Sequence, residues 1–153
     1  MRLMIIGPSG AGKTTLSRAL TGSKGKVQKT QMIDFVDRYI DTPGEYLEIP
    51  RFYKALFVTS QQADIVIMVV PADKYRIYIP EGLAQAFPRP VIGVINKIDL
   101  AGADIHAAAG VLNRTGVKEP YFHILASTGQ GLSRLKSYLE SLDPKSTNEG
   151  LRG

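Results

Sequence analysis

The chain of 153 residues contains no cysteine, has two histidines and has no long hydrophobic run. Without cysteine there can be no disulfide framework, thiolate metal site or cysteine nucleophile, which fits a reducing cytoplasm. The apolar run at the start ends at Gly7 and is too short for a signal peptide or a membrane span. A chain of this length builds one compact core, so we expect a single cytoplasmic domain with no membrane span.

Acidic residues are outnumbered by basic ones, and the formal net charge is +5. Part of the excess comes from Lys24, Lys26 and Lys29, which follow the first predicted helix. Such a cluster can be a solvated loop, or it can lie near bound phosphates. RNA binding is a third reading, but no aromatic residues are interleaved with these lysines, so no nucleic-acid partner is predicted.

Strand-like and helix-like segments alternate along the chain, and we find no internal repeats. Apolar runs predict strands at 2–6, at 32–41 as two strands with a turn at Asp37, and at 64–71, 91–96 and 121–125. Helical patterns occupy 14–20, 51–62, 103–114 and 132–142, and the irregular segment 73–90 holds one short helix at 82–86. This alternation predicts an α/β fold with a mostly parallel sheet of about six strands and helices on both faces. Residues 1–142 form the predicted domain, and 143–153 a disordered tail.

A glycine-rich motif follows the first predicted strand. The sequence Gly7-Pro8-Ser9-Gly10-Ala11-Gly12-Lys13-Thr14 matches the P-loop pattern G-x-x-x-x-G-K-[ST]. Its backbone amides and the start of the following helix form a cradle for phosphate. We expect Lys13 to reach the β- and γ-phosphates, Thr14 to bind magnesium, and Thr15 to join the nucleotide-binding residues.

A second motif, Asp41-Thr42-Pro43-Gly44, ends the next inner strand. By itself this tetrapeptide is typical of many turns. It lies 27 residues after Thr14, at a strand end, where an acid can hold magnesium through water and the Gly44 amide can contact a γ-phosphate. Asp41 and Thr14 are therefore predicted metal-site residues.

The third motif predicts which nucleotide base the protein binds. Asn96, Lys97 and Asp99 close the strand at 91–96. The Asp99 carboxylate can accept hydrogen bonds from N1–H and the 2-amino group of guanine, both absent from adenine, and such pairing can discriminate by ~10⁴-fold. Lys97 would lie along the base, and Asn96 would connect this loop to the P-loop. The set is completed after the last strand by Leu125, Ala126 and Ser127; the Ala126 amide would meet guanine O6. GTP or GDP with Mg²⁺ is the predicted ligand.

These elements, in this order, resemble the Ras-like, translation-factor-related GTPases over about residues 2–142. Within them the chain resembles the EutP/PduV family of ethanolamine- and propanediol-utilization proteins. The resemblance is carried by 7–10, by Lys29-Thr30-Gln31, by 89–93 and most specifically by 40–48. It implies a three-layer α-β-α P-loop NTPase (a Ras-like G domain), cytoplasmic and linked to bacterial microcompartment metabolism.

Several residues depart from the usual Ras-like pattern. The segment between Thr14 and Asp41 is short, and Thr30 is the candidate switch threonine for magnesium and γ-phosphate, with Thr21 as the alternative. No arginine lies between Arg18 and Arg38 to act as an internal arginine finger. Glu45 stands where a water-orienting glutamine is usual; it could orient water, but its charge would oppose the γ-phosphate. We predict slow hydrolysis, with Lys13, Thr30 and Glu45 as catalytic candidates.

Three functions remain open. The first is a GTP-hydrolysing switch whose loops 22–31 and 44–52 bind a protein partner, such as a microcompartment component. The second is a phosphotransferase that passes the γ-phosphate to a small carboxylate, as an acetate kinase does. The third is a non-catalytic module that binds partners according to its nucleotide. The destination of the labelled γ-phosphate distinguishes them.

Overall fold

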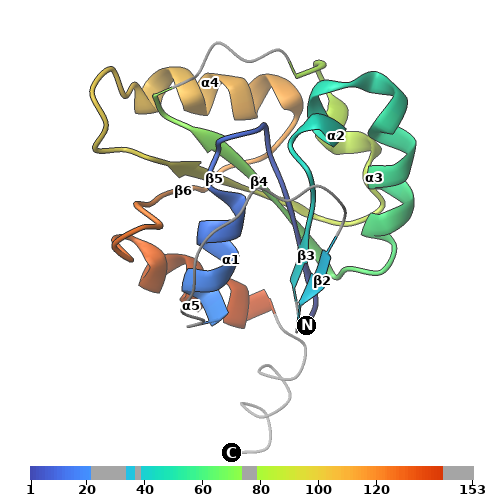
Figure 1. Cartoon of the computed structure of the whole chain (residues 1–153), viewed down its shortest axis with the longest axis horizontal. Helices are drawn as coiled ribbons and strands as arrows, with labels where there is room; N and C mark the ends of the chain where they lie inside the picture. Colours follow the sequence, from blue (N-terminus) through green and yellow to red (C-terminus); the bar gives the residue numbers. More distant parts are fainter. Residues whose placement is uncertain (22–33, 37–38, 74–78, 143–153) are drawn as a thin grey trace, which may run out of the picture.

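The computed structural model describes residues 1–21, 34–36, 39–73 and 79–142. The elements follow one another as β1 (Leu3–Ile6), α1 (Lys13–Thr21), β2 (Asp34–Val36), β3 (Tyr39–Asp41), α2 (Glu45–Glu48), the 3₁₀ helix η1 (Pro50–Phe52), α3 (Tyr53–Ser60), β4 (Ile65–Pro71), the 3₁₀ helix η2 (Leu83–Ala86), β5 (Val91–Asn96), α4 (Ile105–Thr115), β6 (Tyr121–His123) and α5 (Leu132–Leu142). Strands and helices alternate as the sequence pattern predicts (Figure 1).

Six strands form one sheet in the order β2-β3-β1-β4-β5-β6. Neighbouring strands are parallel throughout, except that β2 runs antiparallel to β3 at one edge. β1 lies between β3 and β4, so the loops after β1 and β3 leave the sheet side by side at the same end. The predicted mostly parallel sheet is confirmed, and parallel sheets bind ligands at the carboxyl ends of their strands.

The sheet is covered by helices on both faces, which makes three layers (Figure 1). On one face α1 and α5 pack through Leu16, Leu135 and Leu139 onto alternate residues of the central strands. On the other face α2, α3 and α4 contribute Leu47, Leu56 and Leu112 to a second cluster. All seven residues of β4 are buried, because a central parallel strand is apolar on both sides.

Element boundaries differ from the sequence prediction in several places. The predicted helix 51–62 is shorter, since Pro50 starts a 3₁₀ turn before α3 begins at Tyr53. The predicted loop 44–52 contains helix α2, and the short helix at 82–86 is a 3₁₀ helix. The predicted strand 121–125 ends at His123, because Leu125 instead forms a bridge with Gln130. Helix α4 starts at Ile105 rather than at 103, because the Asp104 side chain caps it by accepting from the Ala107 amide.

Candidate nucleotide-binding site

The P-loop connects β1 to α1 and curls back on itself. Gly10 and Gly12 have φ angles of 79° and 92°, a left-handed backbone that glycine adopts readily. A Cβ on Gly12 would overlap the Asn96 side-chain amide, so a close neighbour also requires glycine there. Lys13 begins α1, is 7% exposed, and its ammonium donates a hydrogen bond of 3.0 Å to the Pro8 carbonyl. The lysine is thus held over the loop at the positive end of the helix dipole.

Thr14 and Asp41, two of the three predicted magnesium residues, are in contact. The Thr14 hydroxyl donates a hydrogen bond of 2.6 Å to a carboxylate oxygen of Asp41, which is 7% exposed. The neighbouring Thr42 hydroxyl donates to the Ile5 carbonyl at 2.9 Å and fixes the end of β3 against β1. A hydroxyl and a carboxylate are hard oxygen ligands, and Mg²⁺ is usually bound by one or two such groups together with substrate phosphates. The donor set therefore fits magnesium.

Asn96 connects the phosphate loop to the two loops predicted to hold the base. It ends β5 and is 3% exposed. Its side-chain NH₂ donates to the Ala11 carbonyl at 2.9 Å, and its side-chain oxygen accepts from the Ala126 amide at 3.0 Å. One buried amide thus joins segments that are 85 and 30 residues away in sequence. The bond to the Ala11 carbonyl is the connection expected of Asn96. The Ala126 amide, predicted to meet guanine O6, instead donates to Asn96 in this structure.

The residues around Asn96 form an open rim. Lys97 has a φ angle of 59°, an uncommon left-handed conformation for a residue other than glycine. Asp99 and Ser127 are exposed, and Leu125 is half-buried. The Leu125 carbonyl accepts hydrogen bonds from the amides of residues 128 and 129, which shapes the loop after β6.

Helix α2 lies directly on the P-loop, a contact that the sequence analysis missed. A Cβ on Gly44 would overlap the backbone of Ser9. The Ser9 amide donates a hydrogen bond of 2.7 Å to the carboxylate of Glu48, at the far end of α2. The family-like run 40–48 was the available signal, but it gave Glu48 no role. Glu45, the predicted water-orienting residue, is half-buried at the start of the same helix.

Some predictions fall outside the described residues. Thr30, the lysines at 24, 26 and 29, the rest of the loop 22–31 and the tail 143–153 are among them, and so is the side chain of Thr21. The predicted metal and catalytic roles of Thr30 therefore stay predictions. Within the described ranges, no group of three or more His, Asp or Glu residues is arranged to hold a metal ion.

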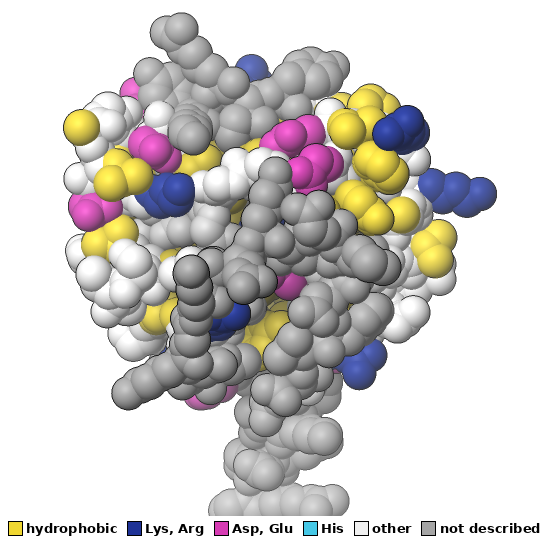
Figure 2. Space-filling view, viewed as in Figure 1, with side chains coloured by type: hydrophobic (Ala, Val, Ile, Leu, Met, Phe, Trp, Pro, Cys, Tyr) yellow, Lys and Arg dark blue, Asp and Glu magenta, His cyan; other side chains and the backbone are white. Residues whose placement is uncertain are grey.

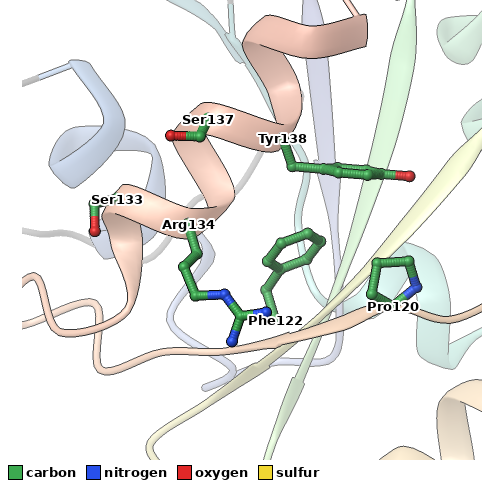
Figure 3. A pocket seen from close by; sticks show the side chains of 6 residues that line it. All are labelled: Pro120, Phe122, Ser133, Arg134, Ser137 and Tyr138. Atoms are coloured by element: carbon green, nitrogen blue, oxygen red, sulfur yellow. The ribbon is translucent and has the colours of Figure 1, made fainter.

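Two hollows lie elsewhere on the molecule. One, of about 480 Å³, lies between β6 and α5, where Phe122 and Tyr138 face each other beside Arg134 (Figure 3). The other, of about 500 Å³, shares Pro120 and Tyr138 with it. Neither contains a predicted nucleotide-binding residue. In the part of the chain that the structure describes, no helix has both the length and the apolarity needed to cross a bilayer.

The fold and the site define the class: this is a P-loop NTPase with the architecture of a G domain. The family model for ethanolamine utilisation and propanediol utilisation proteins (PduV-EutP) matches residues 1–141, and the chain belongs to this family. An Escherichia coli (strain K12) protein named "Probable acetate kinase EutP" is 41% identical over 143 residues, which cover 92% of this chain and 90% of that protein. The Citrobacter freundii propanediol utilization protein PduV is 39% identical, covering 84% of this chain and 87% of that protein. The predicted family is thus confirmed.

More distant similarities agree on the fold. GTPase Era of Maricaulis maris is 28% identical in a match that covers 92% of this chain and 56% of that protein. The crystal structure of a probable GTP-binding protein engB has a TM-score of 0.64 at 21% identity, covering 91% of this chain and 96% of that chain. The G domain of the T. maritima FeoB transporter has a TM-score of 0.57 at 24% identity, covering 90% of this chain and 94% of that chain. The two solved structures share the three-layer fold.

Proposed function

We propose that this protein binds GTP and GDP with Mg²⁺ and hydrolyses GTP slowly, as a switch in ethanolamine or propanediol utilisation. The observation that carries the proposal is the bridge through Asn96, which holds the P-loop and the Ala126 loop on one buried side chain. A single ligand that spans phosphate cradle and base loops is the simplest reason for this connection. The named GTPases among the relatives support the same reading.

The phosphate end of the proposed ligand meets groups of the right charge. Lys13 brings an ammonium to the P-loop, and Thr14 and Asp41 bring the oxygen ligands for magnesium. Bound magnesium would neutralise charge on the β- and γ-phosphates. Glu45 follows Gly44 and is the residue proposed to orient water. Its negative charge beside an anionic phosphate explains why we propose slow hydrolysis.

At the other end, Asp99 is proposed to select guanine. Its carboxylate is exposed at the rim of the base loop, where a base can reach it. The Ala126 amide donates to Asn96 in this structure, so it would have to leave that bond to meet guanine O6.

A phosphotransferase acting on a small carboxylate is the second candidate. It is favoured by one finding: relatives that match nearly the whole chain, at 41% and 38% identity, are named "Probable acetate kinase EutP". The same P-loop, magnesium residues and base loop would serve both reactions. The two candidates differ in what receives the γ-phosphate.

The decisive first measurement is affinity for GTP, GDP and ATP, with and without magnesium. We expect guanine nucleotides to bind at least ~10²-fold more tightly than ATP, because adenine leaves Asp99 without donors. Asp99→Asn should weaken GTP and let xanthosine triphosphate compete, since the amide can donate to the additional carbonyl. Equal affinity for ATP and GTP would refute the base assignment.

Incubation with γ-labelled GTP then separates the two reactions. Release of inorganic phosphate without an acceptor supports hydrolysis, and transfer to added acetate or propionate supports the phosphotransferase. Retention of the label on GTP under both conditions would refute both and leave a non-catalytic module. A single-turnover rate well above the ~10⁻⁴ s⁻¹ of unassisted Ras would contradict slow hydrolysis.

A further inference from the structure

One backbone amide of the P-loop already donates a hydrogen bond to an acidic side chain. The Glu48 carboxylate accepts the hydrogen bond of the Ser9 amide at 2.7 Å. We propose that Glu48 is an internal anion that competes with the third phosphate of a bound nucleotide, so that its release couples α2 to that phosphate. The proposal rests on the proposed function, because it concerns how the same site distinguishes GTP from GDP.

The position of Glu48 is fixed by the turn that carries it. The amides of Leu47 and Glu48 both donate to the Gly44 carbonyl, at 3.1 and 3.3 Å. Gly44 in turn lies so close to Ser9 that a Cβ would overlap its backbone. Leu47 is fully buried and anchors the helix in the core. Glu48 therefore reaches the P-loop from a short, anchored helix, although its own side chain is exposed.

The competition follows from charge. Hydrogen bonds from a backbone amide to a carboxylate are stronger than neutral ones. A third phosphate brings further negative charge to the edge of the cradle where the Gly44 amide is proposed to meet it, and Gly44 touches the same Ser9. Since GDP has no third phosphate, the repulsion acts mainly against GTP. Because Glu48 is exposed, salt should screen this repulsion.

Release of Glu48 would change the outer surface of α2. The Tyr46 ring stacks on Phe52 with centroids 4.6 Å apart, and the Arg51 guanidinium lies 4.9 Å from the Phe52 ring centre. Figure 2 shows acidic side chains near the centre of this face and, to their right, a hydrophobic area over α2 and α3 flanked by basic side chains. A change in α2 would therefore change a surface of mixed aromatic and basic character.

The first test compares Glu48→Gln with the wild-type protein. Glutamine keeps the shape and an oxygen acceptor but removes the charge. We expect the ratio of GTP to GDP affinity to rise at least about threefold at low salt, the scale of an exposed charge interaction. The increase should shrink at high salt. Glu140→Gln, an equal charge change on the exposed surface of α5, should leave the ratio unchanged.

A second test reports α2 directly. The chain contains no tryptophan, so Tyr46→Trp introduces a single tryptophan next to Phe52, which can be excited selectively over the tyrosines. Addition of GTP, but not GDP, should change its fluorescence. The change should be smaller when Glu48→Gln is combined with it, because α2 is then already less tightly held to the P-loop.

The outcomes separate this proposal from the function on which it rests. If the wild-type protein binds neither GTP nor GDP, the proposed function is wrong. If both nucleotides bind but Glu48→Gln leaves their affinity ratio unchanged or lowers it, Glu48 does not compete with the third phosphate. A tryptophan signal that is identical for GTP and GDP would also overturn the coupling to α2.

Discussion

At the scale of single residues, the site depends on buried polar side chains that each connect two loops. Asn96 is the clearest case, since it satisfies one carbonyl and one amide that would otherwise be buried without partners. Buried polar groups left unpaired are costly. The same residue therefore contributes to the folded core and to the alignment of the proposed nucleotide site.

Replacing Asn96 tests this double role. Asn96→Ala leaves the Ala11 carbonyl and the Ala126 amide without their partner, and we expect the free energy of unfolding to fall by roughly 2 kcal/mol or more. Urea denaturation should show a lower midpoint with an unchanged slope. Affinity for guanine nucleotide should fall as well. A variant of wild-type stability would show that the two hydrogen bonds contribute little.

Residue types and spacing predicted much of the site. The P-loop, Asp41 and Asn96 were named as candidates because the chemistry expected of them depends on short local motifs, and the structure brings them together. Glu48 was not, since its role comes from the way α2 packs on Ser9, and a single glutamate in a sequence carries no such information. Residues 22–33 lie outside the described ranges, so Thr30 is untested.

Tyr121 gives a prediction about pH. Burial raises the pKa of its phenol above the ordinary value of 10.0, the Asn113 side chain opposes this, and Glu119 adds to it. The neutral hydroxyl donates to the Val117 carbonyl at 2.6 Å. Because the folded state holds the proton more tightly, this stabilisation is present below the unfolded pKa and is lost as pH rises through the folded pKa.

We therefore expect the wild-type protein to lose more stability than Tyr121→Phe between about pH 9 and about pH 11. Urea denaturation across this range measures both proteins. The variant also lacks the hydrogen bond to Val117 at every pH, which lowers its free energy of unfolding by a constant amount. The diagnostic quantity is therefore the slope of the free energy of unfolding with pH. Parallel pH profiles would contradict the assigned burial effect.

At the scale of helices and strands, the sequence predicted the type of each element better than its first and last residues. The central strands were correctly recognised because apolar runs of β-branched residues leave few alternatives. Helix ends were less accurate: Pro50 interrupts the predicted helix at 51–62, and Asp104 shifts the start of α4. Helix α2 was read as loop, since its four residues are too few for a visible helical period.

The contact between α2 and the P-loop can be tested by adding one methyl group at Gly44. Gly44 has φ −60° and ψ −33°, a helical conformation that alanine adopts freely. The cost of Gly44→Ala is therefore steric, because its Cβ would overlap Ser9. We expect a loss of roughly 1–3 kcal/mol in the free energy of unfolding, as for other overpacked sites.

Gly110→Ala is the matched control for this substitution. Gly110 is exposed within α4, and a Cβ there would meet nothing within 4 Å. Alanine should stabilise that helix by roughly 0.5–1 kcal/mol. Opposite signs for the two variants in the same urea titration would assign the Gly44 effect to packing on Ser9. Similar effects would contradict it.

At the scale of the whole molecule, the strand order brings the site together. β1 lies between β3 and β4, so Thr14 after β1 and Asp41 at the end of β3 meet at the carboxyl ends of the strands. Asn96, two strands away on β5, reaches the same P-loop. A ligand held by all of these segments would stabilise the fold as one unit.

Thermal unfolding with nucleotide measures this coupling. Ligand at about 100 times its Kd stabilises the native state by ~2.7 kcal/mol, so GTP should raise the unfolding temperature, and magnesium should raise it further. Asp41→Asn keeps an oxygen facing Thr14 but removes the charge that the metal needs. We expect it to lose most of the magnesium-dependent increase. Asp64→Asn, which changes an exposed carboxylate bonded to the Arg2 amide, should retain the increase. If Asp41→Asn responds to magnesium as the wild-type protein does, the metal is held elsewhere and the pairing of Thr14 with Asp41 is purely structural.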